Sequence, residues 1–218
     1  MRNIYGLIVS ILYIGLVILL SNLFTKASKE ASRKFIHIML SNWWIIAMVF
    51  FDNVCYAAIL PALFIVINFL SYKFDLIKEM ERDDGISGEN TLGTVYYAIT
   101  LLISVIFSFG IWHNPVIGLI GILIMGYGDG FAAIAGQAIK SKEFKVLGST
   151  KSVVGSATMF IITLIIVSCA FAYLNVPLWF VKSLLIAFIA TVFEAVSPKG
   201  TDNLTVPLLS TFLFYCML

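Results

Sequence analysis

Charged residues are scarce in this sequence. Asp, Glu, Lys and Arg make up 12% of its 218 residues, while 61% are hydrophobic. Soluble domains carry charge on about 25% of their residues, so a soluble globular fold is excluded. Apolar runs long enough to cross a bilayer recur along the whole length. The composition predicts one integral membrane domain over residues 1–218.

Cysteine is rarer still and follows no pattern. The 3 cysteines, Cys55, Cys169 and Cys216, lie in or beside apolar runs, with no CxxC or Cys/His spacing. Neither a zinc site nor a disulfide framework is therefore indicated. The formal net charge of +2 is small, and we expect no nucleic-acid partner.

The apolar runs predict an all-α, polytopic fold with about eight transmembrane helices. The first run of about 20 residues is long for a signal peptide, and its positive charges follow it, so it is expected to be a retained helix. The predicted spans cover roughly 4–24, 35–51, 54–72, 92–110, 115–139, 153–174, 178–196 and 203–218.

The basic residues alternate between the two sides of the membrane. The connections after spans one, three, five and seven hold 12 of the 14 lysines and arginines. The positive-inside rule places these connections in the cytoplasm and both termini outside the cell membrane. Of the acidic residues, only Asp52 falls in an outer turn. The functional face is therefore predicted to be cytoplasmic.

An aspartate interrupts the fifth predicted span. Asp129 lies between Gly128 and Gly130, about 10 residues or 15 Å from the inner end of that span. Carboxylates inside spans are costly and usually functional, and the glycines predict an interrupted helix that lines a cavity. Close helix packing through Ala132 and Gly136 is the alternative explanation for the small residues. It does not explain Asp129.

Two further groups stand at the predicted inner ends of other spans. Arg33, Lys34 and His37 share one helical face. They are either snorkelling bases with a packed histidine or a phosphate-binding, proton-transferring cluster. Thr91 is either a helix cap or part of a helix start that meets an anion.

The connections around spans six to eight carry the remaining candidates. Lys151 and Ser152 precede span six and resemble a phosphate-binding group in chemistry, without a Walker-A sequence. Glu194 ends span seven, and Asp202 and Asn203 begin span eight, where a simple N-cap is the alternative. All these groups converge on the predicted cytoplasmic side. Carboxylates with phosphate oxygens suit Mg²⁺, and phosphoryl transfer needs mainly positioning and charge neutralisation.

Several blocks also resemble a known family, that of the phytol kinases, dolichol kinases and CTP-dependent diacylglycerol kinases. Phosphatidate cytidylyltransferases are similar at a greater distance. The matching blocks lie in order between residues 33 and 208. They read RKFIH, TLGTVYY, GDGFAAIAG, KSVVGSATMF and EAVSPKGTDNLTVPL.

The resemblance implies Mg²⁺-dependent transfer of a phosphoryl group from CTP to a lipid alcohol, either a polyisoprenoid such as phytol or a diacylglycerol. Asp129 would hold Mg²⁺ with Glu194 or Asp202. Lys151, with Arg33 or Lys34, would neutralise phosphates, and His37 or a carboxylate would accept the alcohol proton. The expected nucleotide contacts are Arg33, Lys34, Thr91, Gly128, Gly136, Ser152, Gly155 and Asn203.

The chain departs from the family pattern at two points. Val154 stands where an acidic residue is common, and Gln137-Ala138 where a second glycine is common. Both departures bear on nucleotide preference. The alternatives to a kinase are a phosphatidate cytidylyltransferase, which would release pyrophosphate, and a small secondary transporter with an ion site at Asp129.

Overall fold

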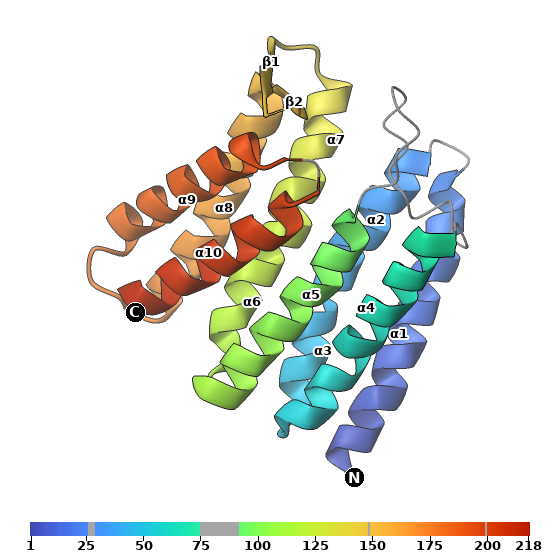
Figure 1. The fold of residues 1–218 in the computed structure, drawn as a ribbon. Helices are drawn as coiled ribbons and strands as arrows, with labels where there is room; N and C mark the ends of the chain where they lie inside the picture. Colours follow the sequence, from blue (N-terminus) through green and yellow to red (C-terminus); the bar gives the residue numbers. More distant parts are fainter. Residues whose placement is uncertain (26–28, 75–91, 148, 199) are drawn as a thin grey trace. The chain divides into compact units, whose positions relative to one another are not determined.

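The structure is a computed structural model that describes residues 1–25, 29–74, 92–147, 149–198 and 200–218. It divides into two compact units, Met1–Pro115 and Val116–Leu218, and each is described by itself. Helices dominate both (Figure 1). The all-α prediction is therefore confirmed, apart from one short β-hairpin in the second unit.

The described residues of the first unit form five α-helices and a π-helical turn. α1 contacts α2, α3 and α4, and α4 packs along α5. The Trp43 indole donates to the Ser10 hydroxyl of α1 at 2.9 Å, and the Tyr13 hydroxyl donates to the Met39 carbonyl at 2.6 Å. The elements are α1 (Arg2–Thr25), α2 (Lys29–Ser41), α3 (Trp43–Phe50), α4 (Val54–Phe74), α5 (Gly93–Val105) and η1 (Ile106–Ile111).

The second unit is built around a long composite helix. α6 continues through the π-helical segment η2 into α7, and α8 packs against both α7 and α9. α10 contacts α9 and η2. The elements are α6 (Pro115–Leu123), η2 (Ile124–Asp129), α7 (Gly130–Ala138), β1 (Glu143–Val146), β2 (Ser149–Ser152), α8 (Val153–Tyr173), α9 (Trp179–Val196) and α10 (Asp202–Met217).

Six stretches of the described chain are long and apolar enough to cross a membrane. They correspond to the predicted spans one and three to seven. A polytopic membrane protein is thus confirmed, whereas the count of eight is not. The six are Arg2–Phe24, Val54–Phe74, Gly93–Ile111, Pro115–Ala138, Val153–Tyr173 and Trp179–Val196.

The other two predicted spans are shorter helices. The run at 35–51 divides at Asn42, where the Asn42 N–H donates to the Met39 carbonyl and the Ile45 N–H to the Asn42 carbonyl, both at 3.0 Å. These three-residue links replace the four-residue links of an α-helix, and asparagine side chains compete for backbone partners in this way. The last run forms α10, which has 16 residues.

Candidate active site

Asp129 lies where the composite helix changes its winding. It ends η2, and the next N–H, that of Gly130, is shared between the carbonyls of Gly126 and Tyr127. The predicted interruption near Asp129 is confirmed as the π-helical segment η2, a form that is frequent at functional sites. A side chain at Gly128 would approach the Met159 sulfur to 2.8 Å, so this glycine lets η2 pack closely on α8.

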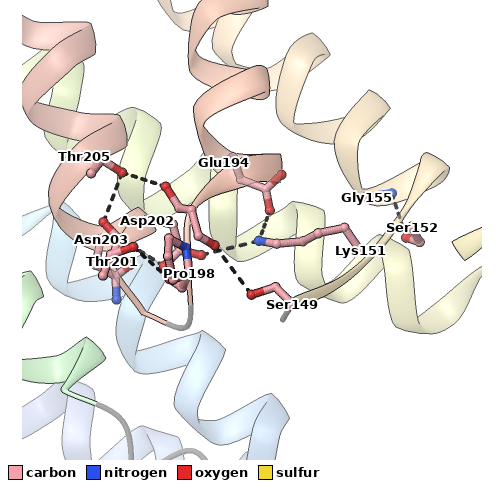
Figure 2. A network of polar contacts seen from close by, with 11 residues as sticks. Ser149, Lys151, Ser152, Gly155, Glu194, Pro198, Thr201, Asp202, Asn203 and Thr205 are labelled. Atoms are coloured by element: carbon pink, nitrogen blue, oxygen red, sulfur yellow. Dashed lines mark hydrogen bonds and ion pairs between the residues drawn. The ribbon is translucent and has the colours of Figure 1, made fainter. Parts of the chain in front are cut away.

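Lys151 lies on the hairpin that connects α7 to α8. Its ammonium forms an ion pair with Glu194 at the end of α9 and a second one, at 3.4 Å, with Asp202 at the start of α10. Figure 2 shows the lysine side chain extended between these two acids. Glu194 is only 4% exposed. The hairpin thus brings a cation to a carboxylate that is buried.

Asp129 completes the cluster. One carboxylate oxygen from each of Asp129, Glu194 and Asp202 lies within 4.8 Å of the others. Together with Lys151 they carry a formal charge of −2, and Glu194 among them is buried. The Glu194 Oε2 atom is buried and accepts no hydrogen bond from the described residues. Oxygen ligands, an excess negative charge and a buried oxygen without a donor fit a hard divalent cation such as Mg²⁺.

The charge state of Lys151 follows from these neighbours. Burial by itself would lower the pKa of its ammonium. The carboxylates of Asp202 and Glu194 oppose this effect and raise the pKa above the ordinary lysine value of 10.5. Lys151 is therefore a cation at any physiological pH. It contributes a fixed positive charge beside the carboxylates.

A network of polar contacts holds the turn between α9 and α10 in place (Figure 2). The Ser197 and Thr205 hydroxyls are 2.8 Å apart, and the Ser149 hydroxyl donates to the Ser197 carbonyl at 3.5 Å. The Asn203 N–H donates to the Asp202 carboxylate at 3.1 Å. Sequence reasoning missed these serines and threonines, because single hydroxyl residues near a turn carry no distinguishing pattern.

Besides Gly128, three more of the predicted nucleotide contacts have a visible packing role. The Ser152 hydroxyl caps α8 by accepting from the Gly155 N–H at 3.1 Å. A side chain at Gly136 would approach the Ser152 hydroxyl to 2.6 Å, and one at Gly155 would approach the Ala132 carbonyl to 3.1 Å. These glycines allow α7 and α8 to touch. Their contact with a nucleotide stays a prediction.

The remaining predicted residues lie in the first unit or outside the described residues. Arg33, Lys34 and His37 are on α2, where the His37 ring packs edge-on against Tyr97 with a centroid distance of 4.8 Å. The Tyr97 hydroxyl donates to the His37 carbonyl at 3.2 Å. Thr91 lies outside the described residues. The roles of these four residues stay predictions.

The fold and the charge cluster together define a polytopic helical membrane protein with an acidic, lysine-containing site in its second unit. No protein-family model matches the chain, and no solved structure matches it. The chain is 32% identical to the phytol kinase of Synechocystis sp. over 215 residues, which cover 92% of this chain and 86% of that relative. It therefore belongs to the phytol kinase family.

Plant relatives are similar over a comparable part of the chain. The probable phytol kinase 1 of Oryza sativa, a chloroplastic protein, is 30% identical over 209 residues, or 87% of this chain and 65% of the relative. The chloroplastic phytol kinase 1 of Arabidopsis thaliana is 29% identical over 206 residues, or 86% and 66%. The chain thus spans about two thirds of these plant proteins.

Proposed function

We propose that this protein is a lipid-alcohol kinase that transfers the γ-phosphoryl group of CTP to the hydroxyl of a long-chain alcohol at the cytoplasmic face of the membrane. An isoprenoid alcohol such as phytol or a polyprenol is the favoured acceptor, and diacylglycerol is the second candidate. The observation that carries this proposal is the convergence of three carboxylates and Lys151 in a membrane-embedded chain. Membership of the phytol kinase family supports it.

Asp129, Glu194 and Asp202 would hold the metal ion. Bound there, Mg²⁺ would supply the charge neutralisation that phosphoryl transfer requires. Lys151 would fix the orientation of Glu194 and Asp202, since its ammonium contacts both carboxylates. Its positive charge would also stabilise phosphate oxygens that approach the cluster. The three carboxylates alone would repel the phosphates of a nucleotide. Mg²⁺ and the Lys151 ammonium would both offset this repulsion.

Arg33, Lys34 and His37 are proposed to act from the first unit. Arg33 or Lys34 would neutralise phosphate oxygens, and His37 or one of the carboxylates would accept the proton of the alcohol. The nucleotide would also contact the small residues Gly136 and Gly155, where α7 meets α8. These assignments rest on the family resemblance.

Product analysis tests the reaction class. Purified protein in nanodiscs would receive Mg²⁺ with CTP or ATP labelled at the γ-phosphate, and phytol, a polyprenol, diacylglycerol or phosphatidate as acceptor. A kinase yields a labelled lipid phosphate and the nucleoside diphosphate. Pyrophosphate and a CDP-lipid would identify a cytidylyltransferase instead. No turnover of any nucleotide, with ion-coupled uptake into liposomes, would identify a transporter.

Asp129→Asn tests the metal assignment. The amide keeps the shape of the side chain and removes its charge. Changing a residue that merely supports a metal ligand costs about 10- to 100-fold in metal affinity or activity. For a ligand itself we therefore expect at least a 100-fold loss of kcat, with folding intact. Asp52→Asn is the matched control, because Asp52 is exposed in the first unit and its carboxylate accepts from Asn3 at 2.6 Å. Full activity of Asp129→Asn would overturn the metal site.

A further inference from the structure

A groove of about 490 Å³ lies between α8 and α9 and is open to the surroundings. α8 lines it with residues at positions i, i+3, i+4, i+7 and i+8 counted from Val153, and α9 with positions i, i+3, i+4 and i+7 counted from Phe188. Such spacings form one continuous stripe on a helix. The groove is therefore a channel between two facing stripes, about 12 Å long from the eight-residue extent on α8.

The groove is apolar along its whole length, because neither of its hydroxyl groups faces it. The Ser156 hydroxyl is buried, and the Thr191 hydroxyl donates to the Ala187 carbonyl of its own helix at 2.8 Å. Phe160 and Phe188 line the part farther from the start of α8. A hydrocarbon chain would match this lining.

One end of the groove is lined by residues that neighbour the charge cluster in sequence. Ala195 follows Glu194 directly, and Val153 follows Ser152, which ends the Lys151 strand. Phe144 also lines the groove and pairs with Lys151 across the hairpin. Residues directly opposite each other in an antiparallel pair lie on the same face. One face of the hairpin thus presents an aromatic ring to the groove and an ammonium to the acids.

We propose that this groove binds the hydrocarbon chain of the acceptor alcohol, with the hydroxyl at the Lys151 end. The assignment rests on the proposed lipid-alcohol kinase function and adds the location of the acceptor. It explains why the groove is open on its outer side, since a lipid can enter sideways from the bilayer.

Ala157→Trp tests the proposal in the kinase assay. The indole would fill the end of the groove near the start of α8, so we expect KM for a long-chain alcohol to rise at least about tenfold, which corresponds to the loss of roughly two buried methylenes. KM for the nucleotide should not change, because no groove residue is among the proposed nucleotide contacts. Ile165→Trp is the matched control, because Ile165 is 53% exposed on the same helix and does not line the groove. Equal effects of both variants, or no effect of either, would overturn the proposal.

Photo-crosslinking gives a second readout that needs no turnover. A long-chain primary alcohol with a diazirine in its chain is expected to label α8 and α9 at groove residues, and labelling should fall with excess unlabelled alcohol and in Ala157→Trp. Uncompeted labelling of all exposed helices alike would mean ordinary bilayer contact and overturn the groove. Competed labelling of the groove without phosphorylation of any alcohol would uphold the groove and refute the kinase function.

Discussion

At the scale of single residues, Lys151 connects three elements of the second unit. It lies on β2, and its ammonium contacts acids from α9 and α10 that follow it by 43 and 51 positions. Its side chain is 17% exposed, and that of Glu194 is 6% exposed. Removing one partner of a buried ion pair leaves the other charge without compensation. The lysine is therefore important for stability as well as for charge at the site.

Lys151→Met should destabilise the protein by about 3 kcal/mol, because it leaves Glu194 buried without its cation. The measurement is thermal unfolding of the purified protein in detergent with EDTA. Lys145→Met is the control, since Lys145 is exposed on the neighbouring strand. Adding Glu194→Gln to Lys151→Met should recover part of the loss, as expected for two residues in contact. An unchanged melting temperature in Lys151→Met would contradict the ion pair.

The ion pair of Lys151 with Glu194 also predicts how the stability of the protein depends on pH. The pKa of Lys151 is raised in the folded protein above its ordinary value of 10.5. Its contribution to stability is therefore fully present below the unfolded pKa and is lost as the pH rises through the folded pKa. The gap in melting temperature between wild type and Lys151→Met should be constant from neutral pH to about 10 and shrink above about 10.5. A gap that shrinks below pH 9 would show that the pKa of Lys151 is lowered instead.

At the scale of elements, helix approach in the second unit depends on Gly121. This α6 residue is buried, and an added Cβ would meet the Thr211 hydroxyl at 1.9 Å and the Pro207 carbonyl oxygen at 2.4 Å. The second atom belongs to the backbone of α10 and cannot move aside alone. The glycine therefore fixes the distance between α6 and α10, and with it the position of α10 beside η2.

Gly121→Ala should lower the stability by about 1–3 kcal/mol, because overpacking forces the two helices apart. It should also lower activity, since Asp202 begins α10 and Asp129 ends η2, the direct continuation of α6. Gly15→Ala is the matched control. A Cβ at Gly15 meets nothing within 4 Å, so that change should be neutral or favourable by up to about 1 kcal/mol. Similar melting temperatures for both variants would contradict this account.

The elements also show how far the sequence alone predicts the structure. Long apolar runs predicted six spans with ends that agree within a few residues, because burial in lipid leaves a strong composition signal. The split at Asn42 and the hairpin at Glu143–Ser152 were not predicted. Both depend on a few backbone hydrogen bonds in polar or mixed sequence, where no periodicity exists to indicate them.

Part of the candidate site could also be predicted, because it too leaves a signal in the composition of the apolar runs. Asp129 and Glu194 stand out because a carboxylate in an apolar run is rare. Their convergence with Asp202 was expected, but the ion pairs of Lys151 were not, because contacts across 43 and 51 positions depend on tertiary packing. Ser149 and Ser197 carried no signal at all. The sequence thus predicted which acids lie near one another and not which of them pair with Lys151.

At the scale of the whole molecule, the number of crossings decides the orientation of every connection. If only the six long helices crossed, the 75–91 connection would lie outside and place Lys78 and Arg82 there, against the positive-inside rule. α2 and α3 together run from Lys29 to Phe50, which at 1.5 Å per residue is about 33 Å and enough to cross the hydrocarbon core. We therefore expect this bent pair to cross, with Asp52 outside and the hairpin inside.

Cysteine labelling tests this topology in intact cells. With Cys55, Cys169 and Cys216 replaced by serine, a membrane-impermeant maleimide should label the Asp52→Cys variant directly and the Lys145→Cys variant only after permeabilisation. Asp52 and Lys145 are both exposed, so the difference reports sidedness and not burial. Labelling of Lys145→Cys in intact cells would place the charge cluster outside the cytoplasm. A cytoplasmic nucleotide would then not reach Lys151, and the kinase proposal would fail along with the orientation.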